Sequence, residues 1–227
     1  MRRALIALLL VLLPGASAFG QVSVQTSVAS DYLFRGVSLT DGRPTASLEV
    51  NYDDSSGWFA GGLATATYLY GESHYEPEYI VDAGYAHALN AGLTWEVGAT
   101  YAVFADFTFW NYTETFVGVL GERWNARLYY APDYFGRGRR TAYAEFNYAQ
   151  PLDEHWRLLG HVGVVHDSDV SVDPHSRTYD ASVGIAARYG SVSFALKRST
   201  LNHENSLYPI DTASGRGNWL LSVAFSY

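Results

Sequence analysis

The last ten residues, Asn218-Trp219-Leu220-Leu221-Ser222-Val223-Ala224-Phe225-Ser226-Tyr227, decide the fold class. Apolar and aromatic side chains occupy every second position, and most positions between them hold small or polar side chains. Because alternate side chains of a strand point to opposite faces, the stretch predicts a strand with one apolar face and one mostly polar face. Such a strand suits lipid on one side and water on the other. The alternative is the edge strand of a soluble β-sandwich.

The amino terminus has the pattern of a secretory signal peptide. Arg2 and Arg3 precede an apolar run over residues 4–13, and Ala16-Ser17-Ala18 offers a small-residue cleavage site. The run is shorter than the roughly 20 residues that a membrane-spanning helix needs. We therefore expect residues 1–18 to be cleaved, which would leave 209 residues and move the net charge from −8 to −10. Residues 19–227 are expected to form one exported, acidic domain.

The amino-acid composition further limits the fold class and the possible functions. The chain has 18 Tyr, 6 Trp and 21 Gly, a combination typical of strands, tight turns and interfacial aromatic belts. Its acidic balance argues against a nucleic-acid partner. Cysteine is absent, which excludes disulfides, thiol nucleophiles and thiolate metal sites. We predict no cofactor.

Alternation with a period of two recurs along the whole chain. It predicts twelve strands, which begin near residues 21, 46, 58, 78, 93, 114, 124, 141, 156, 177, 192 and 218. The connections are alternately short and long, as in outer-membrane barrels with tight periplasmic turns and longer external loops. The sequence therefore predicts an all-β fold, an up-and-down antiparallel transmembrane β-barrel, in the outer membrane of a Gram-negative cell.

One motif resembles a known family. The run Ser-Asp-Tyr-Leu-Phe-Arg-Gly-Val-Ser-Leu-Thr over residues 30–40, followed by Pro44, Tyr52 and residues 56–61, is similar to the opening signature of the proteobacterial TorF family. The similarity continues through residues 112–114 and 129–136 into the terminal strand. The resemblance implies an outer-membrane barrel with a pore role and no established substrate. Leu39 departs from the glutamine that usually follows the family motif.

The terminal strand indicates which partners to expect. An aromatic terminal strand resembles the signal that the barrel assembly machinery recognises, so we expect this machinery and outer-membrane lipids as partners of a monomeric barrel.

Charged side chains occupy the strand positions that we predict to face inward. Such charges need water or a partner. One interpretation is an aqueous pore for small polar or charged solutes, in which an acidic wall faces a more basic wall. The alternative is that neighbours such as Glu114 with Arg127, or Glu145 with Arg157, pair and fill a narrow lumen. The predicted pore-lining residues are Glu49, Glu78, Asp82, Glu96, Glu114, Arg127, Glu145, Arg157, His161, Asp180, Arg188 and Lys197.

Asp31 and Arg35 of the motif have two interpretations. They place two charges at the pore mouth, or they fold the first external loop onto the rim, where Gly36 permits a sharp loop entry. The outward-facing set is predicted to include these aromatics: Trp95, Tyr101, Trp124, Tyr148, Trp156, Tyr179, Tyr189, Trp219 and Phe225.

The sequence gives little indication of a catalytic site or a calcium site. The crowded run His203-Glu204-Asn205-Ser206 lacks the His-x-Ser-Asn arrangement of outer-membrane lipid hydrolases, so no catalytic residue is predicted. Asp167, Asp169 and Asp173 favour a solvated acidic loop over a calcium site, because no glycine sits where an EF-hand loop needs one. The leading function is therefore an outer-membrane porin. A closed structural or adhesive barrel and a lipid-modifying enzyme are the alternatives.

Overall fold

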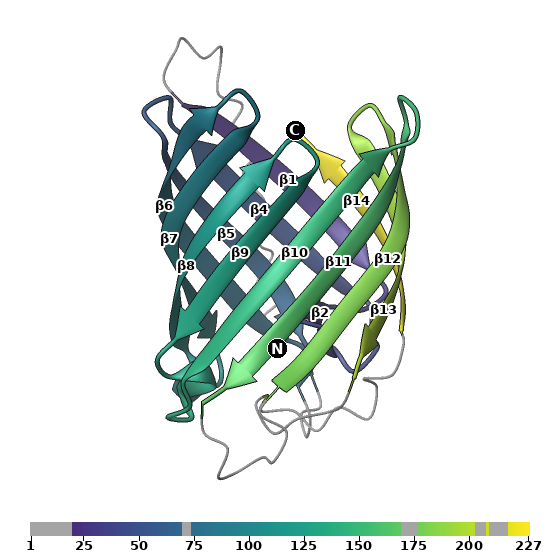
Figure 1. Ribbon diagram of the computed structural model, residues 1–227. Helices are drawn as coiled ribbons and strands as arrows, with labels where there is room; N and C mark the ends of the chain where they lie inside the picture. The colour runs from purple at the N-terminus through teal and green to yellow at the C-terminus, as the bar shows by residue number, and fades with distance from the viewer. Residues whose placement is uncertain (1–19, 70–73, 169–176, 203–207, 209–217) are drawn as a thin grey trace, which may run out of the picture.

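The computed structural model describes residues 20–69, 74–168, 177–202, 208 and 218–227. Twelve long strands in this part of the chain form one closed antiparallel sheet (Figure 1). Their bounds are β1 (Gln21–Ala29), β4 (Thr45–Asp53), β5 (Trp58–Thr67), β6 (Glu76–Asn90), β7 (Leu93–Phe104), β8 (Tyr112–Gly121), β9 (Trp124–Ala131), β10 (Thr141–Pro151), β11 (Trp156–Asp167), β12 (Arg177–Tyr189), β13 (Val192–Leu201) and β14 (Trp219–Ser226).

Each strand pairs with its neighbours in the sequence, and β1 pairs with β14 to close the sheet. In this seam Val28 lies opposite Val223 and Thr26 opposite Phe225. The terminal residues therefore form a strand of the barrel, as their alternation predicts. The closed twelve-stranded barrel confirms the predicted fold class, and the soluble sandwich is wrong.

Short connections gather at one end of the barrel, here called the turn end, and the longer connections at the other, the loop end (Figure 1). Two turns show why the chain reverses so tightly. The Asp54 carboxylate accepts hydrogen bonds from the Ser56 hydroxyl and amide, which hold the pKa of Asp54 below its usual range. The Asp153 carboxylate similarly accepts from the His155 and Trp156 amides, 2.8 and 2.7 Å away.

The outer surface of the barrel is apolar. Trp219 is 61% exposed and Val183 is 57% exposed, although each lies within a strand. Seven of the nine predicted outward aromatics are exposed, while Trp95 and Trp124 are half-buried against neighbouring rings. An apolar surface of this extent belongs in contact with lipid.

No helix in the described part of the chain is long and apolar enough to cross a membrane. The two helical segments are single 3₁₀ turns at the loop end, η1 (Thr108–Trp110) and η2 (Tyr134–Gly136).

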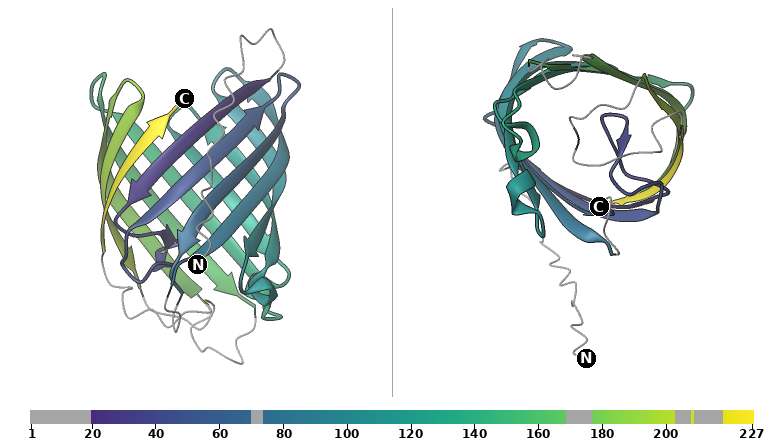
Figure 2. Two further views of the ribbon diagram at one scale, coloured as in Figure 1. Left: turned by 180° about the vertical axis from the view of Figure 1, so that it is seen from behind. Right: turned by 90° about the horizontal axis from the view of Figure 1, so that it is seen from below.

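A small hairpin, which the sequence patterns do not predict, lies inside the barrel. It consists of β2 (Leu33–Phe34) and β3 (Val37–Ser38), joined by Arg35 and Gly36. Both turn residues have positive φ, 51° and 79°, as a two-residue hairpin turn of the primed type requires. Viewed along the barrel axis, the hairpin lies within the ring of strands (Figure 2). The first loop therefore folds into the lumen rather than onto the rim.

Candidate functional site

Asp31 fastens the base of the internal hairpin. Its carboxylate accepts hydrogen bonds from the Ser38 hydroxyl at 2.6 Å and the Thr40 hydroxyl at 2.7 Å. The Thr40 hydroxyl in turn accepts from the Tyr32 amide. Asp31, Ser38 and Thr40 are all buried. Because these hydrogen bonds join residues within one loop, they give the base of the hairpin a defined shape.

Arg35, at the hairpin tip, forms a buried ion pair with the barrel wall. Its guanidinium donates two hydrogen bonds to Glu114 of β8, at 2.9 and 2.6 Å, and one to the Tyr134 hydroxyl at 3.2 Å. Both charged side chains are nearly inaccessible, 6% and 5% exposed. A bidentate guanidinium–carboxylate pair fixes both position and orientation. We call this pair the latch.

Four aromatic rings surround the Arg35 guanidinium. The ring centroids lie 4.2 Å from its central carbon for Tyr143, 4.8 Å for Phe34, 5.3 Å for Tyr129 and 5.5 Å for Tyr134. Such cation–π contacts are stronger when the cation is desolvated, as it is here. Burial raises the pKa of Tyr134 to about 12, so its hydroxyl stays neutral beside the latch.

The hairpin crosses the lumen from one wall to another. Its base continues from β1 and leads into β4, whereas Arg35 reaches β8 and Gly36 touches β12 and β13. A Cβ on Gly36 would lie 2.7 Å from the Asp180 Cβ and 3.0 Å from the Leu201 Cδ1. The residue at this position must therefore be a glycine for space as well as for its backbone conformation.

An apolar cluster packs around the hairpin in the loop half of the lumen. Val37 and Leu39 are at most 2% exposed, and they belong to the same cluster as inward side chains of β7 to β11, of β13 and of η2. We call it the loop-half cluster; its buried members are Val37, Leu39, Leu69, Ala102, Phe104, Tyr112, Ala131, Tyr134, Phe135, Tyr143, Val165, Leu201 and Tyr208. The hydrophobic core of this barrel is therefore inside its loop half.

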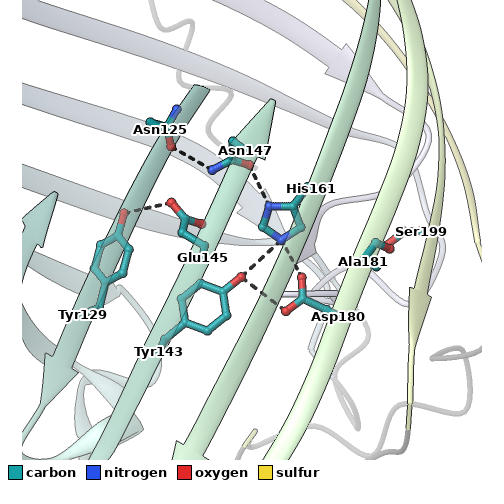
Figure 3. Close-up of polar contacts among 9 residues, drawn as sticks. All are labelled: Asn125, Tyr129, Tyr143, Glu145, Asn147, His161, Asp180, Ala181 and Ser199. Atoms are coloured by element: carbon teal, nitrogen blue, oxygen red, sulfur yellow. Dashed lines mark hydrogen bonds and ion pairs between the residues drawn. The ribbon is translucent and has the colours of Figure 1, made fainter. Parts of the chain in front are cut away.

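On the turn-end side of the hairpin lies a cavity of about 410 Å³ whose lining includes charged and polar side chains, here called the chamber. One hydrogen-bonded chain follows its wall across four strands (Figure 3). The His161 ring nitrogens lie 2.7 Å from Asn147 Oδ1 and 2.7 Å from Asp180 Oδ1. The Tyr143 hydroxyl donates to Asp180 at 3.3 Å, and Asn147 donates to Asn125 at 3.0 Å. This side of the chamber wall therefore presents side chains that hydrogen bonds hold in place.

Inward charges pair, but not as the sequence alternatives propose. Arg127 pairs with Glu96 of β7, and Glu114 pairs with Arg35 instead of Arg127. The register explains the first pair, because Gly118 of β8 stands between Glu96 and Arg127. A Cβ on Gly118 would meet the Cγ atoms of both side chains, at 2.9 and 3.0 Å. The lack of a side chain there lets the two charges meet across a strand. Glu145 and Arg157 form no ion pair in the described part of the chain.

The other predicted lining residues lie at several depths. Glu49 accepts a hydrogen bond from the Asn51 amide at 2.8 Å, and Glu78 is buried in the loop half. Asp82 lies on an inward position of β6, opposite Thr100. Arg157 and Arg188 are exposed at the turn end, where the Arg188 guanidinium donates to the Gly190 carbonyl oxygen.

Two weaker sequence hypotheses fall mainly outside the described residues. His203-Glu204-Asn205-Ser206, Asp169 and Asp173 all do so, whereas Asp167 forms a buried ion pair with Arg139. His74, Glu76 and Asp106 bring possible metal-ligand atoms within 4.8 Å of one another at the loop end. Acidic groups commonly gather without a metal ion, and these three do not by themselves identify a site.

Comparison with known protein families assigns the sequence to one of them. Residues 14–224 match the model of a family described as bacterial protein of unknown function, Gcw_chp. The chain belongs to this family. No curated protein sequence matches the chain.

Solved porin structures share the barrel of this Gcw_chp chain. The KdgM porin matches with a TM-score of 0.58 at 10% identity, over 90% of this chain and 99% of that one. The NanC porin matches with a TM-score of 0.60 at 10% identity, over 91% of this chain and 99% of that one. KdgM porin in complex with disordered oligogalacturonate gives a TM-score of 0.56 at 10% identity, over 91% and 98% of the two chains. These similarities identify the fold.

Sequence reasoning singled out both ends of the latch, Arg35 and Glu114, without joining them. It missed Tyr129 and Tyr143, whose rings face the guanidinium. Their inward strand parity was visible, but an inward tyrosine fits a wet lumen as well as an aromatic enclosure. The signal that was available is the arginine–glycine pair of the family motif, which suits the tip of a tight hairpin.

Proposed function

We propose that this Gcw_chp chain is an outer-membrane channel for small polar or charged solutes, and that the internal hairpin closes its loop half. The observation that carries the proposal is the chamber. A cavity of about 410 Å³ whose lining includes charged, amide and hydroxyl groups lies inside a barrel whose outer surface is apolar. A wet interior within a lipid-facing wall is the arrangement of a solute pore.

The cellular setting follows from the same proposal. The signal peptide over residues 1–18, the resemblance to the TorF family and the fold shared with porins all support export to the outer membrane of a Gram-negative cell. The turn end would then face the periplasm and the loop end the outside. We propose a monomer with no catalytic role, which interacts with the assembly machinery and with lipid.

The charges suggest how solutes would be oriented. Glu49, Asp82 and Glu96 lie on β4, β6 and β7, whereas Lys197 lies on the opposite arc, on β13. A transverse field between such walls would orient dipolar solutes that enter the lumen. Arg127, paired with Glu96, moderates the acidic wall.

A closed structural barrel is the second candidate. The loop-half cluster favours it, because its packed apolar side chains occupy the lumen around the hairpin. The two candidates differ in one respect: a channel requires the hairpin to leave its position, and a structural barrel does not.

Planar-bilayer recording of the refolded protein tests the proposal. We expect discrete conductance steps, brief for the native chain and much more frequent for a variant in which residues 32–39 are replaced by a short Gly-Ser linker. A shortened variant that runs as a folded band on unheated detergent gels and still conducts nothing would overturn the channel and favour the structural barrel.

A further inference from the structure

Six carboxylate or basic side chains line the chamber, and four of them contact one another in two pairs. Arg35 pairs with Glu114 at 2.6 Å, and His161 pairs with Asp180 at 2.7 Å. Two charges of opposite sign remain, Glu145 on β10 and Lys197 on β13.

Neither remaining charge has an ionic partner in the described part of the chain. Glu145 accepts only a long hydrogen bond, 3.4 Å, from the Tyr129 hydroxyl, and Lys197 forms no ion pair. Arg127 lies directly opposite Glu145 in the register, yet its guanidinium points the other way, to Glu96. The chamber thus presents one carboxylate and one ammonium to whatever enters it.

Lys197 lies where the chamber meets a second cavity. This cavity, of about 330 Å³, extends to the turn between β8 and β9 and shares Asn147, His161, Ser182 and Lys197 with the chamber. A solute arriving from the turn end therefore passes the Lys197 ammonium on its way to Glu145. The two volumes are in the range of small-molecule sites, roughly 300–1,000 Å³.

We propose that the chamber binds small zwitterionic solutes, which carry a carboxylate for Lys197 and an ammonium group for Glu145. The inference rests on the proposed function, because it names the class of solute that the channel selects. A simple anion would satisfy Lys197 and be repelled by Glu145, and a simple cation would meet the reverse. A solute with both charges compensates both wall groups at once. Ser182, Ser199 and Asn147 offer neutral hydrogen-bonding groups beside them.

Three probes of similar length test the charge requirement: 4-aminobutyrate, butyrate and butylamine. Saturation-transfer NMR on the refolded protein in detergent measures their dissociation constants without any need for passage. Because partly solvated ion pairs contribute about 0.2–1 kcal/mol, we expect 4-aminobutyrate to bind about 1.4- to five-fold more tightly than either singly charged probe. Equal dissociation constants for the three probes would overturn the proposal.

Substitutions assign the two contacts. Lys197→Gln should abolish the advantage of 4-aminobutyrate over butylamine, and Glu145→Gln should abolish its advantage over butyrate. Arg198→Gln is the matched control for the first, since Arg198 is the next residue and is exposed on the outer face. Glu154→Gln, in an exposed turn, is the control for the second.

An exchange variant keeps the test valid if a single substitution distorts the barrel. Glu145→Lys combined with Lys197→Glu retains one charge of each sign, so the preference for 4-aminobutyrate should persist. Its loss in the exchange variant, or its persistence in both single variants, contradicts the proposal. If the proposed channel function is wrong but the chamber does bind zwitterions, the refolded barrel should bind 4-aminobutyrate and show no conductance.

Discussion

The two halves of the lumen have the same strand alternation and opposite interiors. In the loop half, inward positions hold Phe104, Tyr112 and Val165, each at most 5% exposed against the internal hairpin. In the turn half, inward positions hold amide, hydroxyl and charged groups such as Asn125 and Lys197. The difference shows that a period of two specifies which face is inward, but not whether that face meets water or another part of the chain.

The internal hairpin causes this difference. Where it covers the wall, inward apolar side chains are buried, and where it does not, polar and charged side chains line cavities. Its ionic contact with the barrel wall is the latch, because Arg35 is the only charged residue between Leu33 and Ser38.

Breaking the latch should have the largest effect on the contrast between the two halves. In Glu114→Gln the Arg35 guanidinium stays buried without a carboxylate, and loss of one partner of a buried pair costs about 3–5 kcal/mol. Much of this loss should destabilise the docked position of the hairpin relative to the undocked one. The open probability in planar bilayers should therefore rise by about a hundred-fold or more. Glu145→Gln is the control, because it makes the same chemical change at an inward carboxylate without an ion pair. Equal open probabilities in the two variants would show that the latch does not hold the hairpin.

An arginine introduced on either the outer or the inner face of β12 tests which face contacts lipid. Val183→Arg places a guanidinium on the outer face, at a cost of about 2–4 kcal/mol if the site lies near the bilayer midplane. Ser182→Arg places the same side chain one residue earlier, on the hydrated inner face. Urea titration of protein folded into vesicles should show a clear loss of stability for the first variant alone. The same loss in both would mean that the facing assignment is wrong.

A glycine pair tests the docking of the hairpin tip. Gly36 and Gly42 both have positive φ, 79° and 68°, so alanine strains the backbone at each by about 1–2 kcal/mol. Only at Gly36 would the new Cβ meet another wall, since nothing lies within 4 Å of it at Gly42. We expect Gly36→Ala to raise the open probability more than Gly42→Ala. If Gly42→Ala matches it, the contact with Asp180 and Leu201 has no role in closure.

The smallest effect is expected from a charge in the turn half. Arg127 is 33% exposed and pairs with Glu96, so Arg127→Gln removes an interaction worth about 0.2–1 kcal/mol and leaves an uncompensated carboxylate. The reversal potential in a salt gradient should shift modestly toward cation selectivity, and less so at high salt because of screening. A shift toward anions would contradict the placement of Glu96 on the lumen wall.

The sequence predicts the barrel well for a physical reason. Each strand must separate lipid from the interior, so the alternation is repeated in every strand, and residues 93–103 show it over their whole length. The hairpin could not be found in this way, because strands of two residues have no periodicity. The ion pairs also escaped prediction. Arg127 reaches Glu96 across Gly118, a contact that depends on the register of three strands rather than on spacing along the chain.

The central claim is that the internal hairpin closes the loop half and leaves the turn half hydrated. Thiol labelling in lipid nanodiscs tests this claim most directly. The chain has no cysteine, so a single introduced thiol reports one position. Ser182→Cys lies in the chamber, and Val165→Cys lies in the loop-half cluster, where Val165 is 1% exposed. We expect a water-soluble thiol reagent to label position 182 readily and position 165 very slowly, and Glu114→Gln to accelerate labelling at 165 while leaving 182 unchanged. Equally fast labelling at both positions in the otherwise native chain, or no response of position 165 to Glu114→Gln, would contradict the claim.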